Sequence, residues 1–228
     1  IRNAKPPPSR YSGNPGKALN ELSNELLCDL RDGIRRLWKI ASRIRHSRMQ
    51  SGSLDFASSE VKILVDEKGE PEKILQSESD ESHQLIEEFM LLANETVAKE
   101  LRKKKLPGIF RVHPDPDPEN LEELRSFLSI FGISCGELTS RKEVNKMLSQ
   151  INKHPLAQVL RIKFLRSMKQ ACYRSSPDGH YGLAKRDYLH FTSPIRRYAD
   201  LVVHRVIEQI VRRQKASKSD HEKLEGLA

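Results

Sequence analysis

The stretch that decides the fold covers residues 190–205 and reads HFTSPIRRYADLVVHR. Pro194 suits the first turn of a helix, because a proline there gives up no intrahelical hydrogen bond. The pattern predicts a helix from Pro194 to about Lys215, capped by Thr192 or Ser193. Apolar residues repeat at helical spacing along it, at Ile195, Tyr198, Val202, Val206 and Ile210.

The N-terminal end of this predicted helix contains several groups that can bind an anion. Hydroxyls, free backbone amides and the helix dipole favour an anion there, and Arg196 and Arg197 extend from the first turn. Asp200 lies four residues from both Arg196 and His204, so it can orient both along one helical face. A capped helix with a salt-bridge ladder is the simpler interpretation, but such pairs contribute only about 0.3–0.5 kcal/mol each. The functional alternative is a guanidinium fixed at a phosphate.

Other chemistries fit this stretch less well. A hydrolase triad of Ser193, a histidine and Asp200 would need a G-x-S-x-G turn, which the sequence lacks. His180, His190 and His204 form no HxxxH or HExxH pair, so they do not indicate zinc. The three cysteines form no CxxC pair, which argues against a zinc site and a disulfide framework. A protein that binds a phosphate backbone without chemistry stays the main competitor.

Composition favours an anionic partner. The chain has 228 residues, with 40 Lys and Arg against 31 Asp and Glu, and a formal net charge of +9. Nucleic acid or an acidic membrane fits this excess, although a basic surface can also serve solubility alone. No apolar run approaches the ~20 residues that span a bilayer, and the start lacks the apolar core of a secretion signal. We expect a cytoplasmic protein that does not bind membranes.

Apolar periodicity and turn residues predict further elements along the chain. Residues 19–44 predict an amphipathic helix with a basic face, and residues 60–75 predict a β-hairpin around a Lys-Gly turn. A long helix, capped near Ser79 or Asp80, is expected to be followed by a short strand at 108–113. Three more helices are expected at 118–131, 140–154 and 155–173, with Asp117 and Ser140 capping the first two and Gly132 ending the first.

The first residues differ in composition from the rest. Residues 1–16 contain four prolines and two glycines before any periodic segment begins. We expect a flexible leader there and one domain over residues 17–228, cut from a longer chain. Such a truncation is expected to leave some apolar surface uncovered.

Residues 179–205, GHYGLAKRDYLHFTSPIRRYADLVVHR, resemble the signature of the ribonuclease II/R (RNB) family of processive exoribonucleases. The resemblance covers about residues 20–212 and is closest to the bacterial ribonuclease R branch. It implies an α+β fold, the predominantly helical carboxy-terminal part of an RNB catalytic domain, with about six helices, a β-hairpin and short strands. Further stretches follow the family's order and approximate spacing at residues 51–56, 83–101, 108–132 and 165–173.

The resemblance also implies an activity. Members of this family hydrolyse single-stranded RNA from its 3′ end to nucleoside 5′-monophosphates, with magnesium-assisted attack of water on the phosphodiester. The RNA threads a basic channel in which its bases stack. Single-stranded RNA is therefore the expected partner, magnesium is the expected cofactor of the intact enzyme, and no small-molecule cofactor is implied.

Residue roles follow from matching positions to the family's motifs. Arg196 matches the catalytic arginine, which contacts the scissile phosphate. Glu87 or its neighbour Glu88 matches a carboxylate that touches the terminal nucleotides, and Phe56 matches an aromatic that stacks on the last base. The signature residues expected to line or support the RNA path are Tyr188, His190, Thr192, Ser193 and Arg197.

One part of the family's pattern is missing. In the family, the magnesium-binding aspartates lie in a DxxxxxDxDD-like segment upstream of the stretches matched here, and residues 1–228 contain no such cluster. We expect the flanking OB-type domains to be missing from residues 1–228 as well. The acidic stretch HPDPDPENLEE, residues 113–123, reads as a spacer because prolines alternate with its aspartates. We expect no metal on these residues and no catalysis by them alone. The rival interpretations are a non-catalytic RNA-binding or scaffolding member of the family and a structural helical domain with a basic surface.

Overall fold

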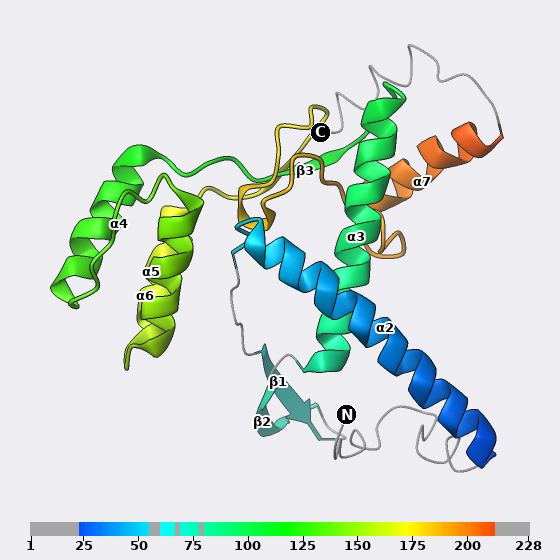
Figure 1. Cartoon of the computed structure of the whole chain (residues 1–228), viewed down its shortest axis with the longest axis horizontal. Coiled ribbons are helices and arrows are strands. Elements are labelled where there is room, and N and C mark those ends of the chain that lie inside the picture. Colours follow the sequence, from blue (N-terminus) through cyan, green and yellow to red (C-terminus); the bar gives the residue numbers. More distant parts are fainter. Residues whose placement is uncertain (1–22, 55–59, 67–68, 78–79, 213–228) are drawn as a thin grey trace. The chain divides into compact units, whose positions relative to one another are not determined.

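The computed structural model describes residues 23–54, 60–66, 69–77 and 80–212, and within them the chain is an α+β fold dominated by six α-helices (Figure 1). This confirms the predicted fold class. No helix among these residues is long and apolar enough to cross a membrane. The chain divides into two compact units, residues 1–46 with 56–89 and residues 47–55 with 90–228. The helices are α2 (Asn24–Gln50), α3 (Glu81–Lys103), α4 (Pro118–Ile130), α5 (Arg141–Lys153), α6 (Ala157–Ser167) and α7 (Tyr198–Val211).

The first unit contains the predicted hairpin. Strand β1 (Glu60–Val65) pairs antiparallel with β2 (Pro71–Ser77), and the register shifts between Leu64 and Val65. The connecting turn closes through hydrogen bonds from the Asp66 N–H to the Glu70 carbonyl at 2.8 Å and from the Gly69 N–H to the Asp66 carbonyl at 3.1 Å. Gly69 has a φ of +85°, a conformation that favours glycine. The hairpin therefore turns at the glycine that the sequence predicted.

Helix α3 begins where one of the two predicted caps lies. The carboxylate of Asp80 accepts hydrogen bonds from the N–H groups of Ser82 at 2.9 Å and His83 at 3.0 Å. The hydroxyl of Ser82 donates to the same oxygen, and these bonds hold the pKa of Asp80 well below its usual range. Asp80 satisfies two of the backbone donors that every helix start leaves open. The other candidate, Ser79, lies outside the described residues.

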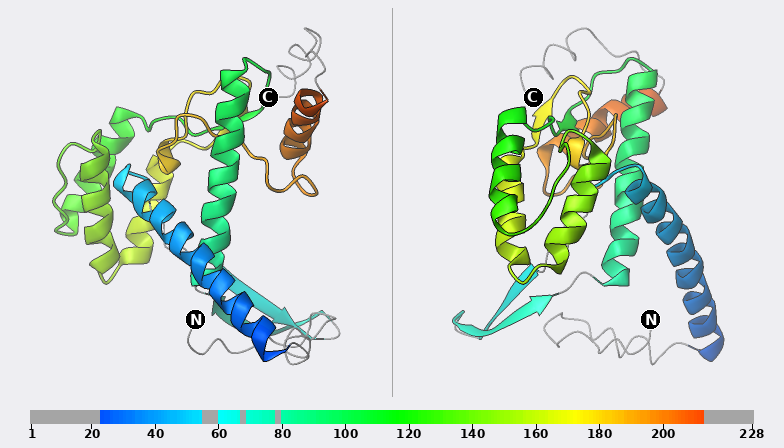
Figure 2. Two further views of the ribbon diagram at one scale, coloured as in Figure 1. Left: turned by 45° about the vertical axis from the view of Figure 1, so that its right-hand side comes forward. Right: turned by 60° about the vertical axis from the view of Figure 1, so that its left-hand side comes forward.

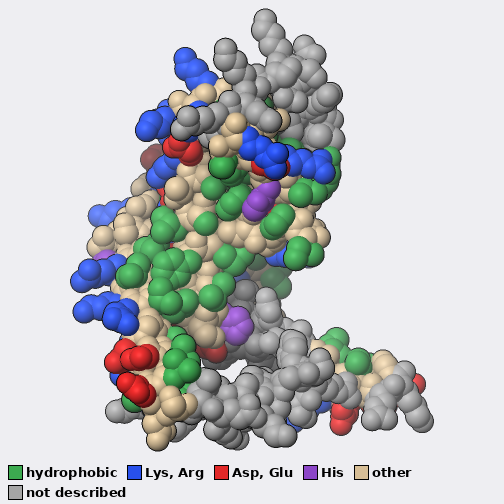
Figure 3. All heavy atoms as spheres, turned by 90° about the vertical axis from the view of Figure 1, so that its right-hand side faces the viewer, with side chains coloured by type: hydrophobic (Ala, Val, Ile, Leu, Met, Phe, Trp, Pro, Cys, Tyr) green, Lys and Arg blue, Asp and Glu red, His purple; other side chains and the backbone are tan. Residues whose placement is uncertain are grey.

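Helix α2 has its predicted amphipathic pattern, but only part of its apolar stripe is covered. Ala41 is fully buried, whereas four leucine and isoleucine residues of the stripe before it are 42–46% exposed. Figure 3 shows one face of the molecule on which hydrophobic side chains gather, with Lys and Arg side chains along part of the edge. Large exposed apolar patches commonly mark surfaces that contact another part of a protein or a partner. The exposed members of the stripe are Leu26, Leu30, Ile34 and Leu37.

The core of the second unit joins α3, α7 and a small sheet. Strand β3 (Phe110–Val112) pairs antiparallel with β4 (Cys172–Arg174). Buried side chains of β3, α3 and α7 belong to one hydrophobic cluster, and these elements can be followed in Figure 1. The buried residues of this core are Ala98, Leu101, Ile109, Phe110, Val112, Leu189, Val202, Val203 and Val206. The segment that carries HFTSPIRRYADLVVHR is therefore anchored in the core through Leu189 and α7.

The predicted helix over 155–173 is too long. Helix α6 ends at Ser167, and Cys172 faces Val112 as part of β4. The buried face of α6 consists of Leu160, Phe164 and Ser167, so the helix ends where its packing surface ends. Beyond it, pairing with β3 satisfies backbone groups of both strands, a tertiary effect that helical periodicity does not contain.

A three-helix cluster forms the remainder of the second unit. Helices α4 and α5 each pack against α6, and the three lie side by side in Figures 1 and 2. Asp117 and Ser140 occupy the N-cap positions, but neither side chain makes a cap hydrogen bond; Asp117 pairs instead with Lys169. Gly132, with a φ of +72°, follows α4 as predicted. The buried side chains are Leu121, Leu124, Leu128, Val144, Met147, Leu148, Ile151, Leu160 and Phe164.

Helix α7 begins at Tyr198, four residues later than predicted. Residues 194–196 form a turn in which the N–H groups of Arg196 and Arg197 both donate to the Ser193 carbonyl, at 3.3 Å and 3.1 Å. The proline therefore opens a turn that precedes the helix, and the two arginines lie before the first helical residue. Which way each arginine projects depends on the contacts of this turn.

Candidate functional site

Residues 179–189 run beside strand β3 as an irregular addition to the small sheet. The Arg111 N–H donates to the Tyr188 carbonyl at 3.0 Å, and the His113 N–H donates to the Gly179 carbonyl at 3.1 Å. The Tyr181 N–H donates back to the His113 carbonyl at 2.8 Å. These bonds fix the start of the segment before it reaches the turn at Pro194.

Asn94 of α3 fastens the next part of the segment. Its side chain is 3% exposed and donates to the Tyr188 hydroxyl at 3.1 Å, while its carbonyl oxygen accepts from the Phe191 N–H at 3.0 Å. Sequence reasoning missed this residue. The available signal was an amide side chain one turn from buried Ala98 and two turns from buried Leu101, a position where α3 faces the core.

We expect Asn94→Ala to lower the free energy of unfolding by about 2–4 kcal/mol, because it leaves buried polar partners without a hydrogen bond. Thr96→Ala is the matched control, since this exposed hydroxyl bonds only the Leu92 carbonyl of its own helix at 2.7 Å. That change should stay within about 0.5 kcal/mol. Urea unfolding of both variants checks the difference, and equal effects would show that Asn94 is not the link between α3 and the segment.

A row of aromatic rings follows the same segment. Consecutive rings meet edge to face with centroids 5.1–5.9 Å apart along most of the row, and His113 meets Tyr181 at 6.0 Å. Arg111 lies over the ring of Tyr173 at one end, 4.9 Å from its centroid, and Arg141 lies over Tyr181 at the other, at 4.5 Å. In order, the row is Tyr181, His113, His180, Tyr188, His190 and Tyr173.

The histidines of this row are held in the neutral form. Burial, together with the neighbouring His113 and Arg111, lowers the pKa of His180 to about 3. Burial and the nearby Arg197 lower the pKa of His190 to about 4, and burial also lowers the pKa of His113. The Nδ1 atom of His190 lies 2.8 Å from the Tyr173 hydroxyl. At neutral pH these rings are uncharged packing surfaces rather than general acids.

We therefore expect acid to destabilise the second unit before its carboxylates titrate. A histidine whose folded pKa is depressed contributes full stability above its unfolded pKa of about 6.5 and loses it as the pH falls towards the folded value. For His180 and His190 together, the free energy of unfolding should fall by up to about 2.7 kcal/mol per pH unit between pH 6 and 5. Urea unfolding across this range checks the slope. His190→Gln should reduce it by roughly half, and an unchanged slope would contradict the assignment.

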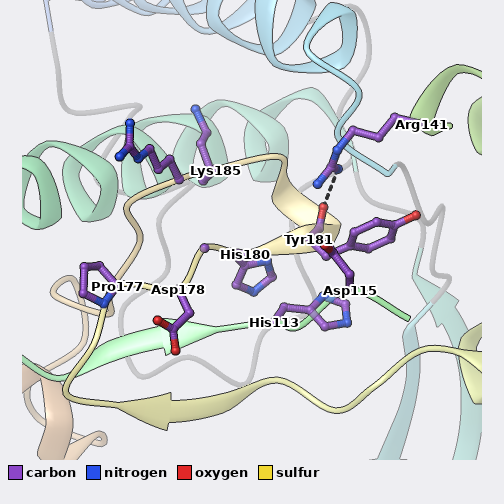
Figure 4. A pocket seen from close by; sticks show the side chains of 10 residues that line it. His113, Asp115, Arg141, Pro177, Asp178, His180, Tyr181 and Lys185 are labelled. Atoms are coloured by element: carbon purple, nitrogen blue, oxygen red, sulfur yellow. Dashed lines mark hydrogen bonds between the residues drawn. The ribbon is translucent and has the colours of Figure 1, made fainter. Parts of the chain in front are cut away.

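A pocket of about 320 Å³ opens beside one end of the ring row (Figure 4). Arg141 donates to the Tyr181 carbonyl at 2.7 Å, and Lys185 forms an ion pair with Glu95. Although burial opposes it, the Lys185 and Lys99 ammonium groups lower the pKa of Glu95. Both inner cations of the pocket therefore already have protein partners, and their role is to hold the segment in place.

The two adjacent arginines of the signature have different environments. Arg197 is half-buried, and its Nη2 donates to the Asp200 carboxylate at 2.7 Å, so the predicted ladder uses Arg197 rather than Arg196. The predicted Asp200–His204 contact is also wrong: His204 Nε2 lies 2.9 Å from the Phe191 carbonyl, and its ring stacks on Phe191 at 4.2 Å. Arg196 is exposed, and its side chain makes no ion pair or hydrogen bond within the described part of the chain.

Comparison with known proteins decides the family. The family model described as the RNB domain matches residues 8–213, which is most of the chain. The chain belongs to the RNB family. This confirms the family that the signature at residues 179–205 predicted.

Relatives of this RNB chain include proteins named ribonuclease R. Ribonuclease R of Thermotoga maritima is 41% identical over 173 residues, which are 75% of this chain and 24% of the relative. The chain thus spans about a quarter of that protein's length. The structure of Mycoplasma genitalium RNase R in complex with double-stranded RNA matches with a TM-score of 0.78 and 28% identity, over 85% of this chain and 35% of that one. Yeast Ssd1, a pseudonuclease, matches with a TM-score of 0.56 and 28% identity, over 64% and 18%.

The other residues predicted from the RNB resemblance have unequal surroundings. Tyr188 is 6% exposed and belongs to the ring row, so it supports the segment. The Thr192 hydroxyl is buried without a hydrogen-bond partner among the described residues, so it does not act as the predicted helix cap. The Asp200 carboxylate accepts from the Ser193 N–H at 2.8 Å. Phe56 lies outside the described residues.

The two acidic candidates belong to the first unit and differ in exposure. Glu87 is exposed, whereas Glu88 is fully buried, with its carboxylate 3.7 Å from the Arg45 guanidinium. A carboxylate that contacts RNA must be reachable by solvent, so exposure favours Glu87 over Glu88 for that role. Both remain candidates from the family motif.

The described residues do not fit a magnesium site. No group of three or more His, Cys, Asp or Glu side chains among them could hold a metal ion. In the acidic stretch 113–123, Asp117 pairs with Lys169 and Glu123 pairs with Lys163 at 2.6 Å. Magnesium prefers several oxygen ligands in octahedral geometry, and these carboxylates are instead neutralised by lysines.

Proposed function

We propose that residues 1–228 are part of a processive exoribonuclease that hydrolyses single-stranded RNA from its 3′ end and releases nucleoside 5′-monophosphates. The observation that carries the proposal is Arg196 of the RNB signature, exposed and unpaired within the described residues, beside an Arg197 that is fixed to Asp200. An arginine kept available next to a fixed one suits contact with an external anion. The relatives named ribonuclease R support the same activity.

In this proposal Arg196 contacts the scissile phosphate. Its planar guanidinium donates two parallel hydrogen bonds to phosphate oxygens and stabilises the negative charge that develops as the phosphodiester is attacked. Arg197 and Ser193 hold the turn through Asp200, while Tyr188 and His190 support it from the ring row. Thr192 lines or supports the RNA path as part of the signature. Glu87 touches the terminal nucleotides.

The remaining features of the proposed enzyme are an aromatic contact to RNA, a cofactor, a partner and a location, and none of them has a described site in this chain. Phe56 stacks on the last base. Magnesium is the cofactor of the intact enzyme, held by carboxylates from outside residues 1–228. Single-stranded RNA is the partner, no small-molecule cofactor is needed, and the location is the bacterial cytoplasm, for which the bacterial relatives are the support.

Degradation of a labelled RNA by the intact protein tests the proposed function. A single-stranded RNA labelled at its 5′ end should shorten progressively from the 3′ end in the presence of Mg²⁺, and the released products should be nucleoside 5′-monophosphates. EDTA should stop the reaction. Release of oligonucleotides, or shortening from the 5′ end, would contradict the proposal.

A non-catalytic RNA-binding or scaffolding role is the second candidate. The match to yeast Ssd1, a pseudonuclease, favours it, because a chain of this fold can occur in a protein without nuclease activity. The sequence upstream of Ile1 in the intact protein discriminates the two. Four closely spaced aspartates there support the enzyme, and their substitution by other residues would support the non-catalytic role.

A further inference from the structure

The carboxylate of Asp200 makes hydrogen bonds that the formation of helix α7 does not require. It is fully buried, and one oxygen of its carboxylate accepts from both the Ser193 N–H at 2.8 Å and Arg197 Nη2 at 2.7 Å. A buried charge costs desolvation free energy, which is recovered only through good pairing. Its second oxygen and the Arg197 Nε are buried without a hydrogen-bond partner among the described residues. Stability alone is therefore a weak reason for this pair.

The contact between Asp200 and Ser193 is incompatible with the helix that the sequence predicts. In a regular helix starting at Pro194, seven residues from Ser193 to Asp200 would correspond to a rise of about 10.5 Å, beyond the reach of an aspartate side chain. The 2.8 Å hydrogen bond can form only when residues 194–197 leave the helical path. Asp200 thus selects the turn over a helix that Pro194 would otherwise open.

The turn is also fixed at both of its ends. Before it, the Phe191 N–H is held by Asn94 and the Phe191 carbonyl by His204. After it, α7 packs into the core through Val202, Val203 and Val206. Between these anchors, Ile195 is completely exposed and Arg196 is exposed beside it. The direction in which Arg196 projects therefore depends on the path of residues 193–197.

We propose that Asp200 is a positioning residue, which holds the Ser193–Arg197 turn out of the helix and so aims Arg196 at the scissile phosphate. The proposal rests on the proposed function. Asp200 itself touches no substrate, since it is fully buried. Asp200 affects hydrolysis only by positioning Arg196. Substitution of Asp200 should therefore have no effect on the rate once Arg196 is removed, whereas substitution of a merely structural residue would still lower it.

A double-mutant cycle in the intact protein tests this. Asp200→Ala should lower the single-turnover rate of RNA hydrolysis by about 30–100-fold, while the dissociation constant for single-stranded RNA changes by less than about threefold, because only the aim of one transition-state contact is lost. In an Arg196→Ala background, Asp200→Ala should have no further effect on the rate. Asp200→Asn, which keeps an oxygen for the Ser193 N–H, should cost less than Asp200→Ala.

Two controls keep the outcome clear. Glu208→Ala removes another carboxylate from α7, where Glu208 pairs with Arg212 at 2.7 Å on the exposed side, and it should leave the rate unchanged. Thermal unfolding of each variant shows whether it folds, and if Asp200→Ala does not fold, the cycle is decided with Asp200→Asn.

The possible results separate the inference from the function on which it rests. If the wild type is active and Arg196→Ala is slow, but Asp200 substitution is neutral or slows the Arg196→Ala protein further, the positioning role is wrong and the proposed function stands. If the wild type is inactive or Arg196→Ala is neutral, the proposed function fails and the positioning role fails with it.

Discussion

Arg196→Lys in the intact protein should lower the turnover number for RNA hydrolysis by about 100-fold or more and change the affinity for single-stranded RNA by less than about threefold. Lysine keeps the positive charge that attracts the RNA backbone, but it loses the planar fork that meets two phosphate oxygens at once. The effect is large because the interaction strengthens as charge develops in the transition state. Single-turnover rates check the expected loss of hydrolysis, and equilibrium binding to the same RNA checks the expected affinity.

The matched control is Arg212→Lys. Arg212 follows α7, is exposed and pairs with Glu208, so the same change of side chain occurs far along the chain from the turn. This variant should keep the wild-type rate. If Arg196→Lys loses binding and turnover to the same extent, Arg196 only positions the RNA backbone and the account of the site is wrong.

Residues 1–228 alone should bind single-stranded RNA with a strong salt dependence and hydrolyse none of it detectably. The net charge of +9 supplies the attraction, while no group of three or more His, Cys, Asp or Glu side chains among the described residues could hold a metal ion. With three to four phosphate contacts, affinity should fall roughly 20–50-fold between 50 and 200 mM salt, following a slope of about −0.7 per contact for single strands. Titration of a fluorescent RNA at several salt concentrations measures the slope.

Two arginine variants test whether Arg196 contributes to the salt dependence of RNA binding. Arg196→Ala should reduce its magnitude by about 0.7, the value expected for one lost phosphate contact, whereas Arg212→Ala should reduce it less. An affinity that does not depend on salt at low ionic strength would remove the physical support for an RNA path. The chain would then be better described as a structural helical domain with a basic surface.

Local patterns predicted most of the helices and the hairpin. The hairpin glycine Gly69, the Asp80 cap and Gly132 are chemical signals that act within a few residues, and the structure confirms each of them. Tertiary contacts explain the failures. The chain at Cys172 leaves the helical pattern to pair with β3, and the turn at Pro194 replaces a helix because a carboxylate six residues further along binds the Ser193 N–H.

The same distinction applies to the site. The residue types of the signature predicted an anion site, and family resemblance singled out Arg196, but i,i+4 spacing paired Asp200 with the wrong arginine. The i,i+4 rule applies within a continuous helix. In the observed turn, Arg197 is the residue that reaches Asp200. Asn94 was missed because its two partners, Tyr188 and Phe191, are more than ninety residues away in sequence. Only the fold brings these groups together.

The most direct test of the central claim is a crystal structure of the intact protein bound to a single-stranded RNA with a non-hydrolysable 3′-terminal linkage. The account predicts the Arg196 guanidinium within about 3 Å of the oxygens of that last phosphate, with Arg197 still paired to Asp200. An Arg196 that points away from the RNA, or an Arg197 that leaves Asp200 to contact the phosphate in its place, would contradict it.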